Sequence, residues 1–279
     1  MTDLARLLTL LDIETIDDDL YRGLTSIGRR TRVYGGQVAA QALVAAGRTV
    51  QPDRFVHSLH AYFMRPGDAT IPIVYDVDRL RDGRSFTTRR VRARQRGKAI
   101  FTLEASFQVI EPDGLTHQPA PPPAPDPQSL PRMSTLAEQA EGSTSAWGEL
   151  LALDFRSQEP QAGEDPEAPM TSWFRATGQV GEDPLTHAAI ITYASDFTLL
   201  SNVLTRHGRW FGEEDLMIAS LDHAMWFHQP RLDASHWMLY ETTSPAAGGS
   251  RGLGFGRIYD QDGTLLVSTA QEGLTRLIG

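Results

Sequence analysis

Two stretches, SLHAYFMRP at residues 58–66 and SLDHAMWFHQP at residues 220–230, share an ordered set of residues. Each begins with Ser-Leu, continues to an aromatic residue followed by Phe, and ends in Pro, with a two-residue insertion in the second copy. A helix-like segment precedes each stretch and strand-like segments follow it. Such ordered self-similarity indicates that one structural unit occurs twice in the chain.

The segments around these two stretches follow the same order of helix and strands in both halves of the chain. We expect a short amphipathic helix within residues 2–19, then a helix at 37–50 and strands at 55–64, 71–80, 86–95 and 98–110. The second half should have a strand at 171–179, a helix at 184–205 and strands at 216–228, 236–243, 252–259 and 265–277. The turns between strands are short and contain Gly, which favours antiparallel neighbours. The sequence predicts an α+β fold with two tandem units, in each of which an antiparallel sheet packs on a helix.

A proline-rich segment separates the two units. Seven prolines lie between positions 119 and 131, and such a run is excluded from helix interiors and central strands. We therefore predict an N-terminal domain at residues 1–112, an extended linker at 113–146 and a C-terminal domain at 147–279.

Composition excludes several classes of protein. The chain has 279 residues, 41% of them hydrophobic, and a net charge of −9; this argues against a general nucleic-acid binder, which needs a broad basic surface. There is no cysteine, which excludes thiolate catalysis and Cys-ligated metal sites. No apolar stretch is long enough to span a membrane and no targeting signal is visible, so we expect a cytoplasmic protein.

One carboxylate stands out in the second predicted helix. Asp196 shares a helical stripe with the apolar or uncharged residues Leu185, Ala189, Thr192, Leu199 and Val203. A carboxylate on such a stripe is costly unless it is hydrogen-bonded or functional. The alternative is a cap, in which Ser195 or Asp196 begins a helix at Phe197, and the residues alone do not choose between the two.

The strand predicted at 216–228 carries further polar residues. Strict alternation places Ser220 and Asp222 on one face and His223 on the other. Gln271 lies in the middle of the last predicted strand, where its amide must find hydrogen-bond partners or face a polar cavity. Taken singly, each of these residues is more often structural than catalytic.

Two other patterns have simple interpretations. Arg90, Arg92, Arg94 and Arg96 alternate along one strand face, which favours a solvated outer face or a salt-bridged surface between subunits over phosphate recognition. The glycines at 252, 254 and 256 lack the dinucleotide-binding spacing, and we interpret them as places where a strand or a ligand approaches closely.

Several long motifs resemble the TesB-type acyl-CoA thioesterase II family. They are HSLHAYFMRPG at 57–67, YDV at 75–77 with LRDG at 80–83, YASD at 193–196, DHAMWFH at 222–228 and STAQEG at 268–273. The resemblance extends from the N-terminal helix nearly to the C-terminus. It implies a double hotdog fold, in which two helices, each wrapped by a curved antiparallel sheet, form a pseudo-dimer within one chain.

The resemblance also implies a reaction and a catalytic set. The family hydrolyses acyl-CoA with a water held by an Asp, a hydroxyl residue and a Gln, and it uses no cofactor or metal. Asp196 and Gln271 match the Asp and the Gln, and Ser220 stands where the family usually has Thr. The chemistry is reasonable because a thiol leaving group has a pKa of about 8.5 and departs without a strong acid.

The first half should contribute to binding the acyl-CoA rather than to its chemistry. Gln37 occupies the repeat position of Asp196, and an amide is no base near neutral pH. We expect Gly35, Gly36, Gln37 and Arg65 to contact the substrate, with one working site in each chain. We also expect a homo-oligomer, a dimer or tetramer of double-hotdog chains.

Two other functions stay open at this stage. A hotdog hydratase or dehydratase would use a His–Asp arrangement, for which Asp222 and His223 are candidates. A non-catalytic acyl-CoA-binding protein would bind the substrate without releasing CoA.

Overall fold

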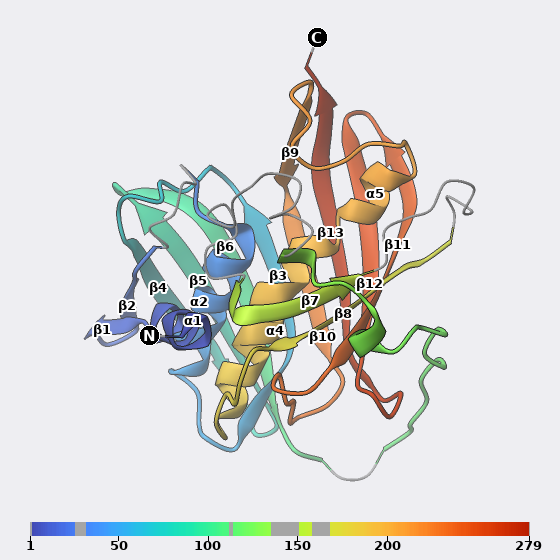
Figure 1. Cartoon of the computed structure of the whole chain (residues 1–279). Helices are drawn as coiled ribbons and strands as arrows, with labels where there is room; N and C mark the ends of the chain where they lie inside the picture. Colours follow the sequence, from blue (N-terminus) through green and yellow to red (C-terminus); the bar gives the residue numbers. More distant parts are fainter. Residues whose placement is uncertain (1, 26–31, 112–113, 135–150, 158–167, 279) are drawn as a thin grey trace.

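The computed structural model describes residues 2–25, 32–111, 114–134, 151–157 and 168–278. Figure 1 shows two halves side by side, each with a helix against a curved sheet. The elements of the first half are α1 (Asp3–Leu11), β1 (Glu14–Asp17), β2 (Leu20–Gly23), α2 (Gly35–Gly47), β3 (Arg54–Phe63), β4 (Ile73–Asp82), β5 (Phe86–Gln95) and β6 (Lys98–Val109). Those of the second half are β7 (Leu153–Ser157), β8 (Met170–Ala176), α4 (Pro184–Thr198), α5 (Ser201–Thr205), β9 (Leu216–Ser220), β10 (Asp222–Phe227), β11 (Met238–Gly248), β12 (Arg251–Tyr259) and β13 (Leu265–Leu277).

The two duplicated stretches pair with each other in the middle of the molecule. The described strands form one antiparallel sheet in the order β1-β2-β4-β5-β6-β3-β10-β13-β12-β11-β8-β7, with β9 also paired to β13. β3 and β10 join the halves, with Tyr62 opposite Asp222 and Ser58 opposite Trp226. The sequence predicted both strands but not their pairing, by which each half covers the open edge of the other.

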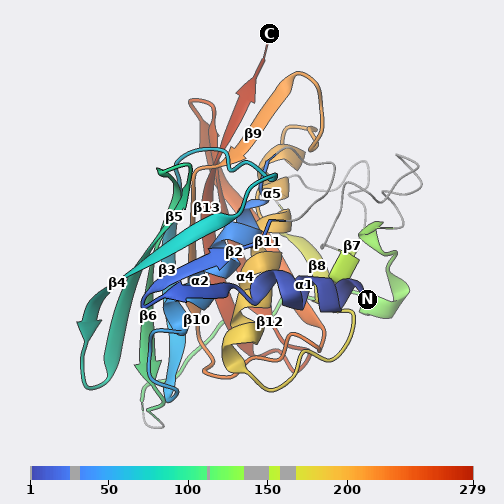
Figure 2. The same cartoon turned by 90° about the vertical axis from the view of Figure 1, so that its left-hand side faces the viewer.

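The two long helices are antiparallel neighbours on the inner side of this sheet, where Figure 2 shows them together with α1. α4 begins with Pro184, and the Asp183 side chain accepts hydrogen bonds from the backbone N–H groups of Leu185 and Thr186. An added methyl group on Gly47, at the end of α2, would meet Leu185 at the start of α4. The start of α2 therefore lies beside the end of α4.

The predicted helix at 184–205 is broken. α4 ends at Thr198 and α5 begins at Ser201, so Leu199 and Val203 do not continue the stripe that carries Asp196. The break lies against glycines of β12, where a methyl group on Gly254 would come within 2.8 Å of the Leu199 carbonyl oxygen and one on Gly252 within 2.1 Å of Val203. Gly252 and Gly254 are thus approached by the α4–α5 segment and not by the strand or ligand expected from the sequence, whereas Gly256 is approached by Tyr240 and Thr269 on the neighbouring strands, as expected.

The proline-rich segment runs along the outside of the second half. Apart from a short 3-10 turn at Pro127–Ser129, its described residues have no regular structure. The indole N–H of Trp173 donates to the Pro125 carbonyl at 2.9 Å, and the Gln118 amide bonds Gly263 and Leu265. The domain boundaries predicted at 112/113 and 146/147 lie outside the described residues.

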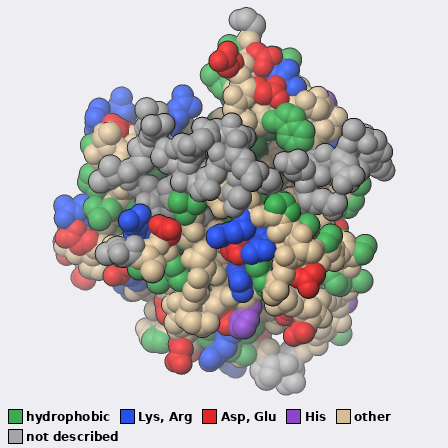
Figure 3. Space-filling view, viewed as in Figure 1, with side chains coloured by type: hydrophobic (Ala, Val, Ile, Leu, Met, Phe, Trp, Pro, Cys, Tyr) green, Lys and Arg blue, Asp and Glu red, His purple; other side chains and the backbone are tan. Residues whose placement is uncertain are grey.

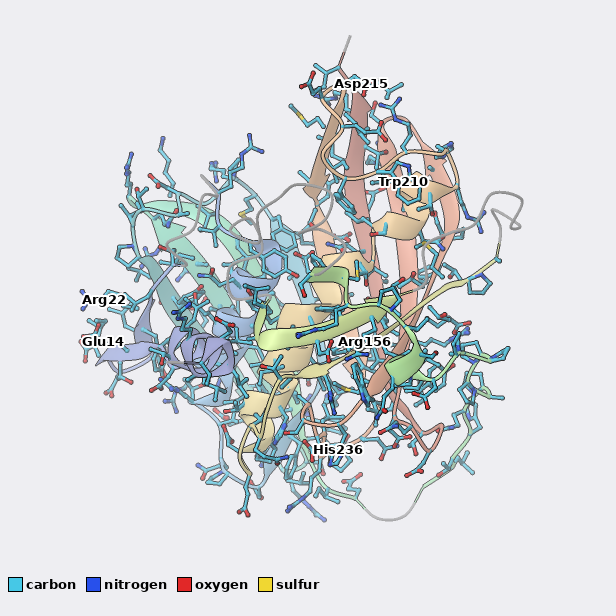
Figure 4. The ribbon with its side chains drawn as sticks, in the orientation of Figure 1. Glu14, Arg22, Arg156, Trp210, Asp215 and His236 are labelled. Atoms are coloured by element: carbon cyan, nitrogen blue, oxygen red, sulfur yellow. The ribbon has the colours of Figure 1, made fainter. Side chains whose placement is uncertain are left out.

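Charged residues of both signs alternate on the surface, as Figure 3 shows for one face. Each arginine of the β5 stripe is ion-paired, Arg90 with Glu104, Arg92 and Arg94 with Asp76, and Arg96 with Asp68. These pairs agree with the solvated outer face preferred from the sequence. Arg22 and Glu14 pair in the same way across β1 and β2 (Figure 4). Among the described residues, no helix is long and apolar enough to cross a membrane.

Candidate active site

Three polar side chains from three elements meet at one oxygen atom. The Ser220 hydroxyl at the end of β9 donates to Asp196 Oδ1 at 3.0 Å, and Gln271 Nε2 on β13 donates to the same oxygen at 2.5 Å. Gln271 is fully buried, whereas Asp196 and Ser220 are partly exposed. The structure therefore brings together the three residues that the resemblance named, although they lie up to 75 positions apart in the sequence.

Asp196 lies within a helix and does not cap one. It is in the last turn of α4, which continues to Thr198, so a helix beginning at Phe197 is wrong. The surrounding residues of α4 are almost all buried. Two hydrogen-bond donors on one carboxylate oxygen offset the cost of placing this group on a buried helix.

Ser220 faces the helices because the strand predicted at 216–228 is interrupted at Leu221. β13 pairs Gly273 with Ser220 of β9 but Ala270 with Ala224 of β10, which is a register shift of one residue. A one-residue bulge moves the next side chains to the opposite face. Ser220 and His223 thus share the inner face, which corrects the opposite faces expected from strict alternation.

The bulge is held by backbone hydrogen bonds on both sides. The Leu221 N–H donates to the Glu272 carbonyl at 2.9 Å, and the Leu221 carbonyl accepts the Phe63 N–H at 2.9 Å. Asp222 points away from the helices and accepts the Glu272 N–H at 2.7 Å. Partial burial raises the pKa of the Asp222 carboxyl, an effect reduced by that hydrogen bond.

His223 is a buried neighbour of the three converging residues. Its Nε2 lies 2.8 Å from the Ser195 hydroxyl, and only 1% of the residue is exposed. Burial lowers the pKa of the imidazole to about 4, an effect partly offset by the neighbouring Gln271 side chain. The sequence suggested a core histidine bonded to backbone, whereas the hydrogen-bond partner is the Ser195 side chain on α4.

Two tyrosines that sequence reasoning did not single out support the last turn of α4. The Tyr34 hydroxyl donates to the Tyr193 carbonyl at 2.8 Å, and the Tyr240 hydroxyl donates to the Ser195 carbonyl at 3.1 Å. Burial raises the pKa of Tyr240, which keeps it a neutral donor. Both hydroxyls bind helix carbonyls within three residues of Asp196 and so restrict the position of that carboxylate. A buried aromatic hydroxyl needing a partner was the only signal in the sequence.

The start of α2 lies beside the carboxylate. An added methyl group on Gly35 would be 2.5 Å from Asp196 Oδ2, and one on Gly36 would be 2.3 Å from the Tyr193 carbonyl. Tyr34, the residue before the helix, provides no side-chain cap. The N–H groups of the first turn have no partner within a helix and carry its positive end. The site thus combines a carboxylate, two donors and a helix N-terminus.

The other residues expected to contact substrate are not part of this cluster. Gln37 is 1% exposed and its amide donates to the Leu24 carbonyl at 3.1 Å. Arg65 is exposed, and its guanidinium donates to the Ala99 carbonyl at 2.7 Å. Substrate contact by these two side chains stays a prediction. Within the described part of the chain, no three His, Asp or Glu side chains are grouped as a metal site would require.

Comparison with known proteins matches both halves. Residues 25–108 match the family model of the acyl-CoA thioesterase N-terminal domain, and residues 151–274 match that of acyl-CoA thioesterase. Human acyl-coenzyme A thioesterase 8 is 41% identical, over 96% of this chain and 88% of its own length.

Solved structures agree with these matches. Acyl-CoA thioesterase II TesB2 from Mycobacterium marinum is 41% identical with a TM-score of 0.80, covering 96% of this chain and 97% of that one. A hot dog fold protein of unknown function from Alicyclobacillus acidocaldarius is 19% identical with a TM-score of 0.80, over 97% of this chain and 98% of that one, and shows the fold alone. The fold is therefore a double hotdog, and the chain belongs to the TesB-type acyl-CoA thioesterase II family.

Proposed function

We propose that the protein hydrolyses fatty acyl-CoA to a free fatty acid and CoA, by direct attack of a water held by Asp196, Ser220 and Gln271. The observation that supports this most strongly is the convergence of Ser220 and Gln271 on Asp196 Oδ1, at 3.0 and 2.5 Å. The names of the relatives give the substrate class.

The hydrogen-bond donors and acceptors that remain on Asp196, Ser220 and Gln271 are suited to holding one water molecule. Ser220 uses its only hydroxyl hydrogen on Asp196, so its oxygen is left as an acceptor. Gln271 uses one of its two amide hydrogens on Asp196 and keeps the second. A water can then donate one hydrogen to Asp196 and one to Ser220 while accepting from Gln271. One lone pair of this water remains, and it attacks the thioester carbon.

The N-terminus of α2 is suited to the charge that develops on the carbonyl oxygen. It lies at Gly35, against Asp196 Oδ2, and Tyr34 supplies no side chain to cap it. Backbone N–H groups at a helix start stabilise an oxyanion in the transition state of acyl transfer. We assign the oxyanion to the N–H groups of the first turn of α2, which lie close to Asp196 because Gly35 has no side chain.

Asp196 acts as the base in the hydrolysis. The water oxygen bonds to the thioester carbon, its proton moves to Asp196, and the carbonyl electron pair becomes the oxyanion. When that pair returns, the carbon–sulfur bond breaks and CoA leaves as thiolate, and the proton on Asp196 passes to the thiolate, directly or through solvent. The products are the fatty acid and CoA, and the carboxylate is regenerated.

The arrangement argues against a hydratase or dehydratase. Asp222 and His223 point to opposite faces of β10, Asp222 toward the Glu272 N–H and His223 toward Ser195. They therefore make no His–Asp dyad with each other, which is the feature on which that alternative depended.

Release of CoA decides between the three functions. Purified protein is incubated with acyl-CoA esters of increasing chain length, and free thiol is measured with a chromogenic thiol reagent. The chain contains no cysteine, so all the thiol detected comes from CoA. Thiol release that needs the enzyme supports hydrolysis, whereas saturable binding without release indicates a binding protein. With an enoyl-CoA, loss of the double bond while the thioester persists would indicate hydration and contradict the proposal.

A further inference from the structure

Two buried polar atoms beside the proposed catalytic set have no assigned partner. Gln271 Oε1 and His223 Nδ1 are both inaccessible to solvent and make no hydrogen bond of standard geometry within the described residues. Buried polar atoms are nearly always paired. Two such atoms on adjacent side chains therefore indicate that they are partners of each other.

The positions of the two side chains make this pairing possible. β10 and β13 pair Ala224 with Ala270, so His223 and Gln271 are the next opposed residues in the same register. Both point to the inner face, with exposed fractions of 1% and 0%. The Gln271 amide has a fixed orientation, because a carboxylate only accepts and Nε2 must therefore face Asp196. Its oxygen is left for His223.

The ring of His223 has one proton to place. Because burial lowers its pKa to about 4, the imidazole is neutral at neutral pH and has one N–H. If Nε2 carried that proton, Nδ1 and Gln271 Oε1 would be two buried acceptors side by side. If Nδ1 carries it, the ring donates to Gln271 Oε1 and Nε2 accepts from the Ser195 hydroxyl, 2.8 Å away. That hydroxyl then gives up its alternative acceptor, the Thr192 carbonyl at 3.0 Å, which as a carbonyl inside α4 still accepts the backbone N–H four residues on. Only the second arrangement gives every buried atom a partner.

We propose that His223 is a positioning residue that, as the Nδ1–H tautomer, donates to Gln271 Oε1 and so holds the Gln271 amide against Asp196 and the attacking water. A chain of hydrogen bonds then runs from Ser195 through His223 and Gln271 to Asp196. Donation to the amide oxygen polarises the amide and strengthens its N–H groups as donors. The inference rests on the proposed function, because it gives Gln271 a task in holding water.

Three variants separate this role from simple packing. In His223→Asn the amide nitrogen replaces Nδ1, in His223→Gln it lies closer to the position of Nε2, and His223→Phe removes both nitrogens while keeping a ring. We expect kcat to fall by about ten- to hundredfold in the Phe and Gln variants, as for a reacting group misplaced by a fraction of an ångström to 1 Å. KM should change less than about threefold. His223→Asn should keep at least a third of kcat, whereas a packing role predicts that Asn is damaged at least as much as Phe.

Non-additivity provides the second test. His223→Phe is combined with Gln271→Ala, and kcat is measured for both single variants and the double variant. If His223 acts only through Gln271, the double variant is no slower than Gln271→Ala. If the factor by which kcat falls in the double variant is the product of the factors in the two single variants, the proposal is wrong.

The tautomer is measured without any reference to activity. Nitrogen NMR of wild-type protein labelled with ¹⁵N-histidine shows which ring nitrogen is protonated, and the signal missing from His223→Asn identifies His223 among the eight histidines. A proton on Nδ1 supports the proposal, and one on Nε2 overturns it even if the Phe variant fails to fold. Failure of the proposed function would instead appear as normal CoA release by a folded Asp196→Asn variant.

Discussion

Substitution of Gly35 by alanine adds one methyl group where the proposed base has no room to move. The methyl carbon would lie 2.5 Å from Asp196 Oδ2, whereas ordinary contact begins at 3.4 Å, so the carboxylate must retreat by about 0.9 Å. The Phe63 ring is 3.0 Å from the same methyl carbon and limits the other direction of relief. The retreat disturbs the hydrogen bonds from Ser220 and Gln271, which fix the carboxylate.

The expected effect is a large loss of turnover with little loss of stability. A misplacement of about 1 Å in an active site costs about a hundredfold in rate, or about 2.7 kcal/mol of activation free energy. Strain at the contact destabilises the fold, but alanine is favoured over glycine in a helix by up to about 1 kcal/mol. We therefore expect kcat for acyl-CoA to fall about a hundredfold in Gly35→Ala, with a melting temperature within a few degrees of wild type.

The matched control is Gly47→Ala, the same change at the other end of α2. Its methyl group would meet Leu185 Cδ1 at 2.5 Å, the end of a flexible side chain far from Asp196. This variant should keep wild-type kcat even if it loses some stability. Thiol release measured side by side on both variants provides the assay. A folded Gly35→Ala protein with kcat within threefold of wild type would refute the argument that turnover depends on the exact position of the Asp196 carboxylate.

Three further predictions concern the same cluster. Asp196→Asn should reduce kcat by about 10²- to 10⁴-fold, whereas Gln37→Ala should retain most of kcat. A non-hydrolysable acyl-CoA should titrate to one equivalent per chain. Two bound equivalents per chain, or equal losses of kcat in both variants, would mean that the two halves share the chemistry. Ser220→Thr should be tolerated and Ser220→Ala should lose about ten- to thousandfold in kcat, so an alanine variant as active as wild type would leave Ser220 an ordinary strand residue. Because the pKa of His223 is about 4 in the folded protein and 6.5 for an ordinary histidine, its stabilising contribution is complete above pH 6.5 and is lost as the pH falls toward 4. Denaturant unfolding should show about 3 kcal/mol more loss over this range in wild type than in His223→Asn, and identical slopes would contradict the burial of a neutral ring.

Local patterns in the sequence determined much of the architecture. Alternation and Gly-containing turns predicted β5 and β13 with the bounds that the structure has, and β3 and β6 to within one residue. The duplicated stretches indicated two equivalent units, and Ala-rich composition predicted α2. These features depend on residues close together in the chain, where side-chain period and turn chemistry are sufficient. Asp196, Ser220 and Gln271 came from motif resemblance, since each alone has a structural interpretation.

Tertiary structure alone decided how those elements form a site. The bulge at Leu221 turns Ser220 toward Asp196, and it depends on hydrogen bonds that Leu221 accepts from Phe63 and donates to Glu272, on two neighbouring strands. A one-residue bulge leaves no periodic signal, yet it reverses the face of every residue on one side of it. The break between α4 and α5 and the position of Gly35 beside Asp196 are contacts between segments far apart in the chain. Such contacts are set by the packing of the two long helices against the single sheet formed by both halves, and the composition of either segment alone does not specify them.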